Sequence, residues 1–371
     1  MKKTYVWALP TRLFHSLLII SIILAFILSE SENLLPYHAA IGYGVGVLIV
    51  FRIIWGLIGP KYSRFKDFPL SIKEAIEFSL SIFHPKKKYL GHNPAASFVM
   101  IALIIVLFFV TLSGVLTYGI QEGRGIVGFL NSSFFKEMEL FEEIHEFFTT
   151  LLLFLIVIHL IGVVIDYLFH REDETWKSIF TGYKNIEGEP VSLTLFHKFI
   201  AFLFFIIFII VIFVAVQKDS IFQASIYNKV EYNKLSATFV EECSACHTLY
   251  PPFLLSKQSW KKLMQKEALA NHFGDDASLD EATRVAIKKF LIQNSAQTST
   301  KEASVYIGQN PNNNDIIAMT QSSYWKEKHK NIDKNIFKSK KVISKANCKA
   351  CHSDIEKGLI EDSNIKIPKG V

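Results

Sequence analysis

The stretch that decides the fold is HEFFTTLLLFLIVIHLIGVVIDYL, residues 145–168. It is apolar over the ~20 residues that a membrane-spanning helix needs. His145 and His159 are 159 − 145 = 14 positions apart, which puts their rings near one helix face and ~21 Å apart along the axis. Ionisable side chains at membrane depth are costly and usually functional, and imidazole is a haem ligand. The alternative is a helix with two hydrogen-bonded structural histidines.

Composition indicates a membrane module followed by a water-soluble one. Of the 371 residues, 50% are hydrophobic and 32 are Phe, and the apolar part ends near residue 217. The formal charge of +6 is too small to indicate nucleic-acid binding, and part of it belongs to loops that flank membrane spans. All four cysteines fall in two Cys-x-x-Cys-His units, so none remains for a disulfide or a thiol nucleophile.

Five apolar runs predict five membrane spans, at residues 13–29, 38–58, 98–119, 145–168 and 193–216. The first could be a cleaved signal peptide, but it is long, lacks a small-x-small cleavage site and contains His15, so we expect it to be retained. The loop 59–96 is rich in Lys and Arg, which marks the cytoplasmic side, and its segment SIKEAIEFSLSIF predicts an amphipathic helix on the membrane surface. The N-terminus is then cytoplasmic, and everything after Gln217 lies outside.

This topology sorts the membrane histidines into two pairs. His15 and His159 should share the cytoplasmic half of the bilayer, and His38 and His145 the outer half. Two pairs at two depths predict two bis-histidine b haems stacked across the membrane. The fifth span is then a tether for the outer domain. The other histidines of the membrane part are expected to be interfacial or solvated: His84, His92, His170 and His197.

Two motifs after the last span predict c-type haem attachment. They are CSACH, with Cys243, Cys246 and His247, and CKACH, with Cys348, Cys351 and His352. In such a motif the two thiols bond to the haem and the adjacent histidine binds the iron. A lone Cys-x-x-Cys could be a zinc knuckle or a redox dithiol, but two copies that each precede a histidine favour haem. Candidates for the sixth iron ligands are Met264, Met319, His272 and His329.

The segments WALPTRLFH, HAAIGYGVG, FRIIWGLIGPKYSRF, YLGHNPAAS and the histidine helix resemble, in this order, the bacterial cytochrome b-561 family, which is related to the cytochrome b subunits of nickel–iron hydrogenases. The resemblance covers about residues 5–183 and implies a four-helix dihaem core that exchanges electrons with quinone. It implies the same four ligands: His15, His38, His145 and His159. Ser16 departs from the family, which often has an aromatic residue there. Arg52 lies near the cytoplasmic haem level, where a buried propionate would need a cation.

The segments CSACHTLYPPFLLSKQSWKKLM…ANHFGDDASLD and YWKEKH…NCKACHSDIEKGLIEDSNIKIPKG resemble the two halves of the bacterial dihaem cytochromes c, over about residues 238–370. The resemblance implies His272 as the distal ligand of the first c haem and His329 as that of the second. Met264 then belongs to the core, and Met319 is the weaker alternative ligand.

Two polar stretches complete the outer domain. Between its halves, NSAQTSTKEASVYIGQNPNNND predicts a loop or linker. Nine lysines between residues 326 and 349, against Glu327 and Asp333, predict either a docking face for an acidic redox partner or a solvated face that balances haem propionates.

The sequence thus predicts an all-α protein. Residues 1–190 form a membrane dihaem cytochrome b module, 191–217 the fifth transmembrane helix, and 218–371 a mainly helical periplasmic dihaem cytochrome c domain. We expect a multi-pass protein of the bacterial inner membrane that transfers electrons between the quinone pool and a periplasmic redox partner through two haem b and two haem c. Six-coordinate irons leave no open substrate site. Whether it counts as a quinol-oxidising enzyme stays open.

Three alternatives to this function remain at this point. The electron flow could be reversed, from a periplasmic dehydrogenase or hydrogenase to quinone. The b module could oxidise superoxide in a quinone-linked reaction. The chain could also be a haem-based gas or redox sensor, if one distal histidine leaves its iron on reduction.

Overall fold

The computed structural model describes residues 3–81, 87–310 and 315–368; His84 lies outside these residues. The chain forms two compact units. Unit 1 comprises Met1–Gly119, Arg124–Val127 and Leu140–Ala224, and unit 2 comprises Ile120–Gly123, Gly128–Glu139 and Ser225–Val371. In the described residues both units are helical, as the sequence predicts, apart from one antiparallel pair of two-residue strands.

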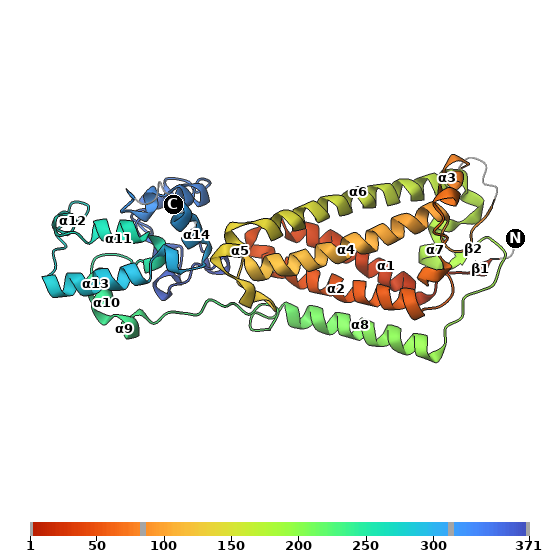
Figure 1. Cartoon of the computed structure of the whole chain (residues 1–371), viewed down its shortest axis with the longest axis horizontal. Coiled ribbons are helices and arrows are strands. Elements are labelled where there is room, and N and C mark those ends of the chain that lie inside the picture. The colour runs from red at the N-terminus through yellow and green to blue at the C-terminus, as the bar shows by residue number, and fades with distance from the viewer. Residues whose placement is uncertain (1–2, 82–86, 311–314, 369–371) are drawn as a thin grey trace. The chain divides into compact units, whose positions relative to one another are not determined.

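Among the described residues, five helices of unit 1 are long and apolar enough to span a membrane (Figure 1). They are α1 (Leu9–Leu28), α2 (Leu35–Ile58), α4 (Pro94–Ile120), α6 (Leu140–Phe169) and α8 (Leu195–Ala215). The first four begin before the apolar runs because their first turns carry good helix starters. Pro10, Pro36 and Pro94 provide a preset φ where no amide donor is needed. In α6, Glu142 and Glu143 suit the positive end of the helix dipole.

The core of unit 1 is centred on α2, which packs against both α1 and α8. Phe51 and Trp55 stack with ring centroids 5.2 Å apart, and Phe51 also contacts Phe204 and Phe205 of α8. Gly44 lets α8 approach, because a Cβ there would collide with a side chain of α8. Helix α8, the predicted fifth span, is therefore packed along α2.

Short elements close the end of unit 1 at which α1 begins. Strand β1 (Thr4–Tyr5) pairs with β2 (Tyr183–Lys184) in the register Thr4↔Lys184. Helix α7 (Thr175–Thr181) precedes β2, and α3 (Ile72–Leu80) lies in the loop between α2 and α4. Ile72, Ile76 and Leu80 are spaced by four and are all exposed, so α3 has the apolar stripe expected of a helix on a membrane surface.

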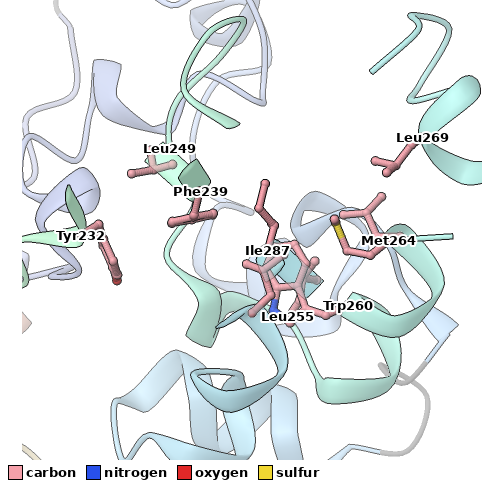
Figure 2. Packing of buried hydrophobic residues seen from close by; sticks show 10 residues of the cluster. Tyr232, Phe239, Leu249, Leu255, Trp260, Met264, Leu269 and Ile287 are labelled. Carbon is pink, nitrogen blue, oxygen red and sulfur yellow. The ribbon is translucent and has the colours of Figure 1, made fainter. Parts of the chain in front are cut away.

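Unit 2 consists of short helices around two small cores. Its helices are α5 (Ser133–Glu137), α9 (Tyr232–Leu235), α10 (Ala237–Cys243), α11 (Lys257–Leu263), α12 (Lys266–Ala270), α13 (Glu281–Gln293), α14 (Glu302–Gln309) and α15 (Ser323–Lys328). Figure 2 shows the first core, in which Trp260 and Met264 pack near Ile287. Met264 is 4% exposed, which confirms it as a core residue. Met319 packs against the second core, which contains Phe253.

Single turns of 3-10 helix connect these elements in both units. They are η1 (Glu32–Leu34), η2 (Phe65–Asp67), η3 (Gly128–Leu130), η4 (Arg171–Asp173), η5 (Pro252–Leu254), η6 (Ala296–Thr298), η8 (Met319–Gln321), η9 (Ile336–Lys338), η10 (Cys348–Ala350), η11 (Ile355–Lys357) and η12 (Asp362–Asn364).

The segment predicted as a loop or linker is instead partly folded. It forms η6 and α14, and Ala303 and Ile307 of α14 are buried in the second core of unit 2. The prediction was wrong because these two apolar residues, one helical turn apart, were outnumbered by polar neighbours. Residues 311–314 of the segment lie outside the described residues.

Unit 2 also contains most of the loop between α4 and α6. The Lys136 ammonium, 6% exposed, donates hydrogen bonds to the carbonyls of Gln121 and Thr300. The Tyr227 hydroxyl donates to the same Thr300 carbonyl at 2.8 Å. These bonds join a loop of the membrane part of the sequence to the segment that follows η6.

Candidate haem centres

The eight histidines predicted as iron ligands form four facing pairs. The distances between ring centroids are 6.4 Å for His15–His159, 6.3 Å for His38–His145, 6.2 Å for His247–His272 and 6.0 Å for His329–His352. We call these the first to fourth pairs. The first two lie in unit 1 and the last two in unit 2.

These distances fit one iron between the rings of each pair. An imidazole nitrogen bonds a metal at about 2.0 Å and lies roughly 1.1 Å from its ring centroid, so two imidazoles on opposite sides of an iron have centroids about 6.2 Å apart. All four observed distances lie within 0.2 Å of that value. The residues present therefore fit bis-histidine haem, although ligation by each named histidine stays a prediction.

The second pair shows how neighbouring groups orient a ligand. The Nδ1 of His38 lies 2.8 Å from the Ala25 carbonyl, and the Nδ1 of His145 lies 3.1 Å from the Val110 carbonyl. A carbonyl only accepts, so each Nδ1 carries the proton and Nε2 keeps its lone pair for a metal. Gly114 of α4 faces the His145 ring, and a Cβ there would lie 2.9 Å from its Cε1.

The third pair joins the CSACH motif to a tight turn. The Nδ1 of His247 bonds to the Thr248 carbonyl at 2.7 Å, which leaves its Nε2 free. His272 bridges to Asp275 across a turn in which Phe273 and Gly274 have φ of 56° and 106°. Burial, and then the neighbouring His247, lower the pKa of His272, so its imidazole is neutral and able to bind a metal at neutral pH.

The fourth pair joins the CKACH motif to the end of α15. The Nδ1 of His329 bonds to the Trp325 carbonyl at 2.8 Å, and its ring stacks on the indole with centroids 4.4 Å apart. Burial lowers the pKa of His329, while burial and then His329 lower that of His352. Both rings are thus neutral near pH 7.

The four cysteines lie in surroundings that suit haem attachment. In the described part of the chain, no three His, Cys, Asp or Glu side chains converge as a metal cluster would require. Burial, with a minor contribution from Glu242, raises the pKa of Cys243 to about 12, and burial raises that of Cys348 to about 11. Thiols that become thioethers of a haem need no stable charge, so these raised pKa values are compatible with haem attachment.

The two attachment motifs lie against each other within unit 2. The Tyr250 hydroxyl donates to the Ala346 carbonyl at 2.5 Å, and the Leu249 amide donates to Glu356 at 3.1 Å. The Tyr250 ring also lies 5.1 Å from the His247 ring, centroid to centroid. Tyr250 therefore touches one motif histidine and the segment that leads into the other motif. Sequence reasoning missed it because nothing distinguishes this tyrosine before the chain folds.

Two histidines of unit 1 are less solvated than the sequence suggested. His92 packs between Trp7 and Phe68, with ring centroids 4.8 and 4.6 Å away, and its Nδ1 is buried. The His170 side chain is 9% exposed and its Nδ1 lies 3.3 Å from an Asp166 carboxylate oxygen. The expectation failed because short loops fold back over the bundle end. His197 lies at a helix start, where its Nε2 is 2.9 Å from the Ile58 carbonyl.

Comparisons with known proteins found matches for both the membrane part and the C-terminal part of the chain. The prokaryotic cytochrome b561 family matches residues 6–182, and the dihaem cytochrome c family matches residues 239–360. Among solved structures, the diheme cytochrome type c from Shewanella baltica OS155 is 30% identical, covering 36% of this chain and 93% of that one, with a TM-score of 0.29. A search of curated proteins gave no match.

A second similar structure, the diheme cytochrome c from Rhodobacter sphaeroides, is 35% identical, covering 36% of this chain and 99% of that one, with a TM-score of 0.30. Because both TM-scores are below 0.5, the assignment rests on the two family matches. Residues 6–182 thus match the prokaryotic cytochrome b561 family and residues 239–360 the dihaem cytochrome c family, and these two parts make the chain a membrane electron-transfer cytochrome with haem of both the b and the c type.

Proposed function

We propose that this cytochrome transfers electrons between the quinone pool of a bacterial inner membrane and a periplasmic redox protein. It would do so through two haem b and two haem c, with each of the four histidine pairs holding one iron. The observation that carries the proposal is the near-equal centroid distance of the four pairs, from 6.0 to 6.4 Å.

In this proposal the named residues have separate tasks. His15 and His159 hold one b haem, and His38 and His145 the other. Cys243 and Cys246 would attach the first c haem, and His247 and His272 would bind its iron. Cys348 and Cys351 attach the second, with His352 and His329 as ligands. Haem iron supplies the one-electron exchange, and the chain sets its position, ligand basicity and exposure to water.

Bis-histidine ligation favours electron transfer over binding of a gas or substrate. An iron held from both sides has no free coordination position, so electron exchange takes place without a bond to the substrate. The hydrogen bonds to the Nδ1 atoms of His38, His145, His247 and His329 oppose loss of a ligand, because they fix each ring in place. This counts against the sensor alternative.

The proposed orientation places the N-terminus in the cytoplasm and the C-terminal domain in the periplasm. Five spans put the two ends of the chain on opposite sides, and both Cys-x-x-Cys-His motifs follow the fifth span. The basic loop between α2 and α4 supports a cytoplasmic position for that end of the bundle. Haem c attachment outside the cytoplasmic membrane is consistent with this orientation.

The proposed periplasmic partner is an acidic protein that docks on the lysines between residues 326 and 349. All nine are exposed, and six of them lie in the segment between His329 and the CKACH motif. Glu302, Glu327 and Glu356 pair with Lys328, Lys330 and Lys349. An excess of positive charge remains, and it would steer an acidic partner toward the fourth pair.

Reduction of the purified full-length protein by a quinol analogue tests this function. If the proposal holds, the absorbance bands of b haem appear first and those of c haem follow, and a variant with both His145→Ala and His159→Ala loses both responses to quinol. Reduction of c haem at the wild-type rate in this variant would contradict the proposed route through the membrane module. Potentials of the four haems relative to quinone then decide the direction of flow.

A further inference from the structure

Two buried cations lie at the end of unit 1 at which α1 begins. Arg52 of α2 and Lys184 of β2 are each 3% exposed. With His92, Trp7 and Phe68 they form one group of side chains, which we call the cationic chamber. Its members come from separate elements, and the β1–β2 pairing brings Lys184 back to the N-terminal segment.

The cations are held by carbonyls and aromatic faces. The Lys184 ammonium donates to the carbonyls of Gly91 and Tyr89 at 2.9 and 3.4 Å and lies 5.8 Å from the Trp7 ring. The guanidinium carbon of Arg52 lies 5.7 Å from the Phe68 ring centroid.

Further contacts fix the rest of the chamber. Arg52 donates one hydrogen bond, at 3.3 Å, to the Ser63 carbonyl, and its guanidinium also lies 5.0 Å from the Phe65 ring. His92 packs between Trp7 and Phe68, and its buried Nδ1 has no hydrogen-bond partner in the described structure. Buried polar atoms normally have a hydrogen-bond partner, so this atom beside two cations indicates that a group outside the polypeptide accepts its hydrogen bond.

The charges of the chamber are unbalanced. Within the described residues, no carboxylate lies within ion-pair distance of Arg52 or Lys184. Burial lowers the pKa of Lys184 to about 8 although Asp166 and Asp173 oppose the shift. Burial, and then the positive charges of Arg52 and Lys184, lower the pKa of His92 to about 3. Buried charges are normally paired, so this excess of positive charge indicates a bound anion.

The chamber is at the level of the first pair. Arg52 is 58 − 52 = 6 residues before the end of α2, and His15 is 15 − 9 = 6 residues after the start of α1. At ~1.5 Å per residue, both lie ~9 Å from the same end of these antiparallel helices. His159 is also among the groups whose charge acts on His92.

We propose that Arg52, Lys184 and the Nδ1–H of His92 bind the two propionate carboxylates of the haem that His15 and His159 hold. Two cations match two carboxylates in charge, and His92 adds a neutral donor. The inference rests on the proposed ligation by the first pair and adds residues to it. Both cations favour the reduced haem, because a ferrous centre with its propionates carries one more negative charge than a ferric one.

Redox titration of the full-length protein tests the inference. Lys184→Met removes the charge and keeps much of the side-chain length, Lys184→Arg keeps the charge, and Lys73→Met removes an exposed charge from α3 as a control. We expect Lys184→Met to lower the midpoint potential of one b haem, so that the reduced-to-oxidised ratio at a fixed potential falls at least fivefold. The other b haem should change less than twofold, and Lys184→Arg and Lys73→Met should resemble the wild type.

Two outcomes overturn the inference. One is a full complement of haem b in Lys184→Met with both b potentials unchanged. Lys184 would then have only a structural role, through its hydrogen bond to the Gly91 carbonyl. The other is an equal shift in the midpoint potentials of both b haems, which would mean that Lys184 does not act on one particular haem. Failure of the proposed function itself would look different, because the wild-type chain would then hold fewer than two haem b.

A second variant covers the case in which Lys184→Met does not fold. His92→Phe keeps an aromatic ring between Trp7 and Phe68 and removes the Nδ1 donor. We expect it to shift the propionate bending band in the resonance Raman spectrum of one b haem while the haem content stays unchanged. An unchanged band would remove His92 from the site.

Discussion

Replacement of Gly114 by alanine should release the haem b that we propose His38 and His145 hold. The added Cβ would lie 2.9 Å from Cε1 and 3.2 Å from Nδ1 of His145. Ordinary carbon contacts are about 3.5 Å, so the ring must move by roughly 0.6 Å. Metal–ligand bonds tolerate deviations of about 0.2 Å, so the displaced ring can no longer share an iron with His38.

The energetic cost should be moderate and confined to the second pair. Overpacking of a buried site costs about 1–3 kcal/mol, enough to displace a ring without unfolding a five-helix bundle. Gly162→Ala is the matched control, because Gly162 is exposed on α6 and a Cβ there would meet no atom within 4 Å. That change should leave the haems intact and stabilise α6 by up to ~1 kcal/mol through helix propensity.

Pyridine haemochrome analysis of purified protein is the assay for both variants. We expect Gly114→Ala to hold about one haem b per chain or to show a new high-spin signal, and Gly162→Ala to match the wild type. If Gly114→Ala keeps its full content of low-spin haem b and an unchanged Tm, then the reasoning is refuted, because His145 either is not a ligand or can move without losing the iron.

Other predictions concern unit 2. Tyr250→Phe loses the hydrogen bond to Ala346 and should destabilise unit 2 by ~1 kcal/mol, measured as a lower Tm of the c-haem Soret band, whereas an unchanged Tm would argue against this bond. Met264→Ala leaves a cavity beside Trp260 and should destabilise unit 2 by about 2–5 kcal/mol by the same readout, without changing the c-haem potentials. Altered potentials would instead indicate that Met264 is a ligand. Exchange of Lys338, Lys340 and Lys341 for glutamate should slow reduction of an acidic partner at least tenfold at low salt and little at high salt, and a loss independent of salt would count against electrostatic docking.

The histidines of the four pairs were predicted from three kinds of signal: helix spacing and span topology for His15, His38, His145 and His159, the Cys-x-x-Cys-His motifs for His247 and His352, and the resemblance to the dihaem cytochromes c for His272 and His329. Histidines 14 positions apart on an apolar helix and cysteines followed by histidine have fixed geometric consequences. The predicted partners of each histidine are the ones that the fold brings to 6.0–6.4 Å. Helix starts were less predictable, because Pro10, Pro36 and Pro94 extend three spans beyond their apolar runs.

What surrounds the pairs depends on contacts between distant segments. Lys184 reaches the cationic chamber through a two-residue strand that no sequence pattern marks. Tyr250 makes its hydrogen bond to Ala346 only after the segments of the two motifs have come together. Helix α14 is stabilised because Ala303 and Ile307 are buried in the second core of unit 2. Tertiary packing overrides local preference at each of these positions.

Counting the haems of the purified full-length chain tests the central claim most directly. The account predicts two haem b and two haem c per chain by pyridine haemochrome, all low-spin in the electron paramagnetic resonance spectrum of the oxidised protein. A single haem b per chain, or a persistent high-spin centre in freshly purified protein, would contradict it.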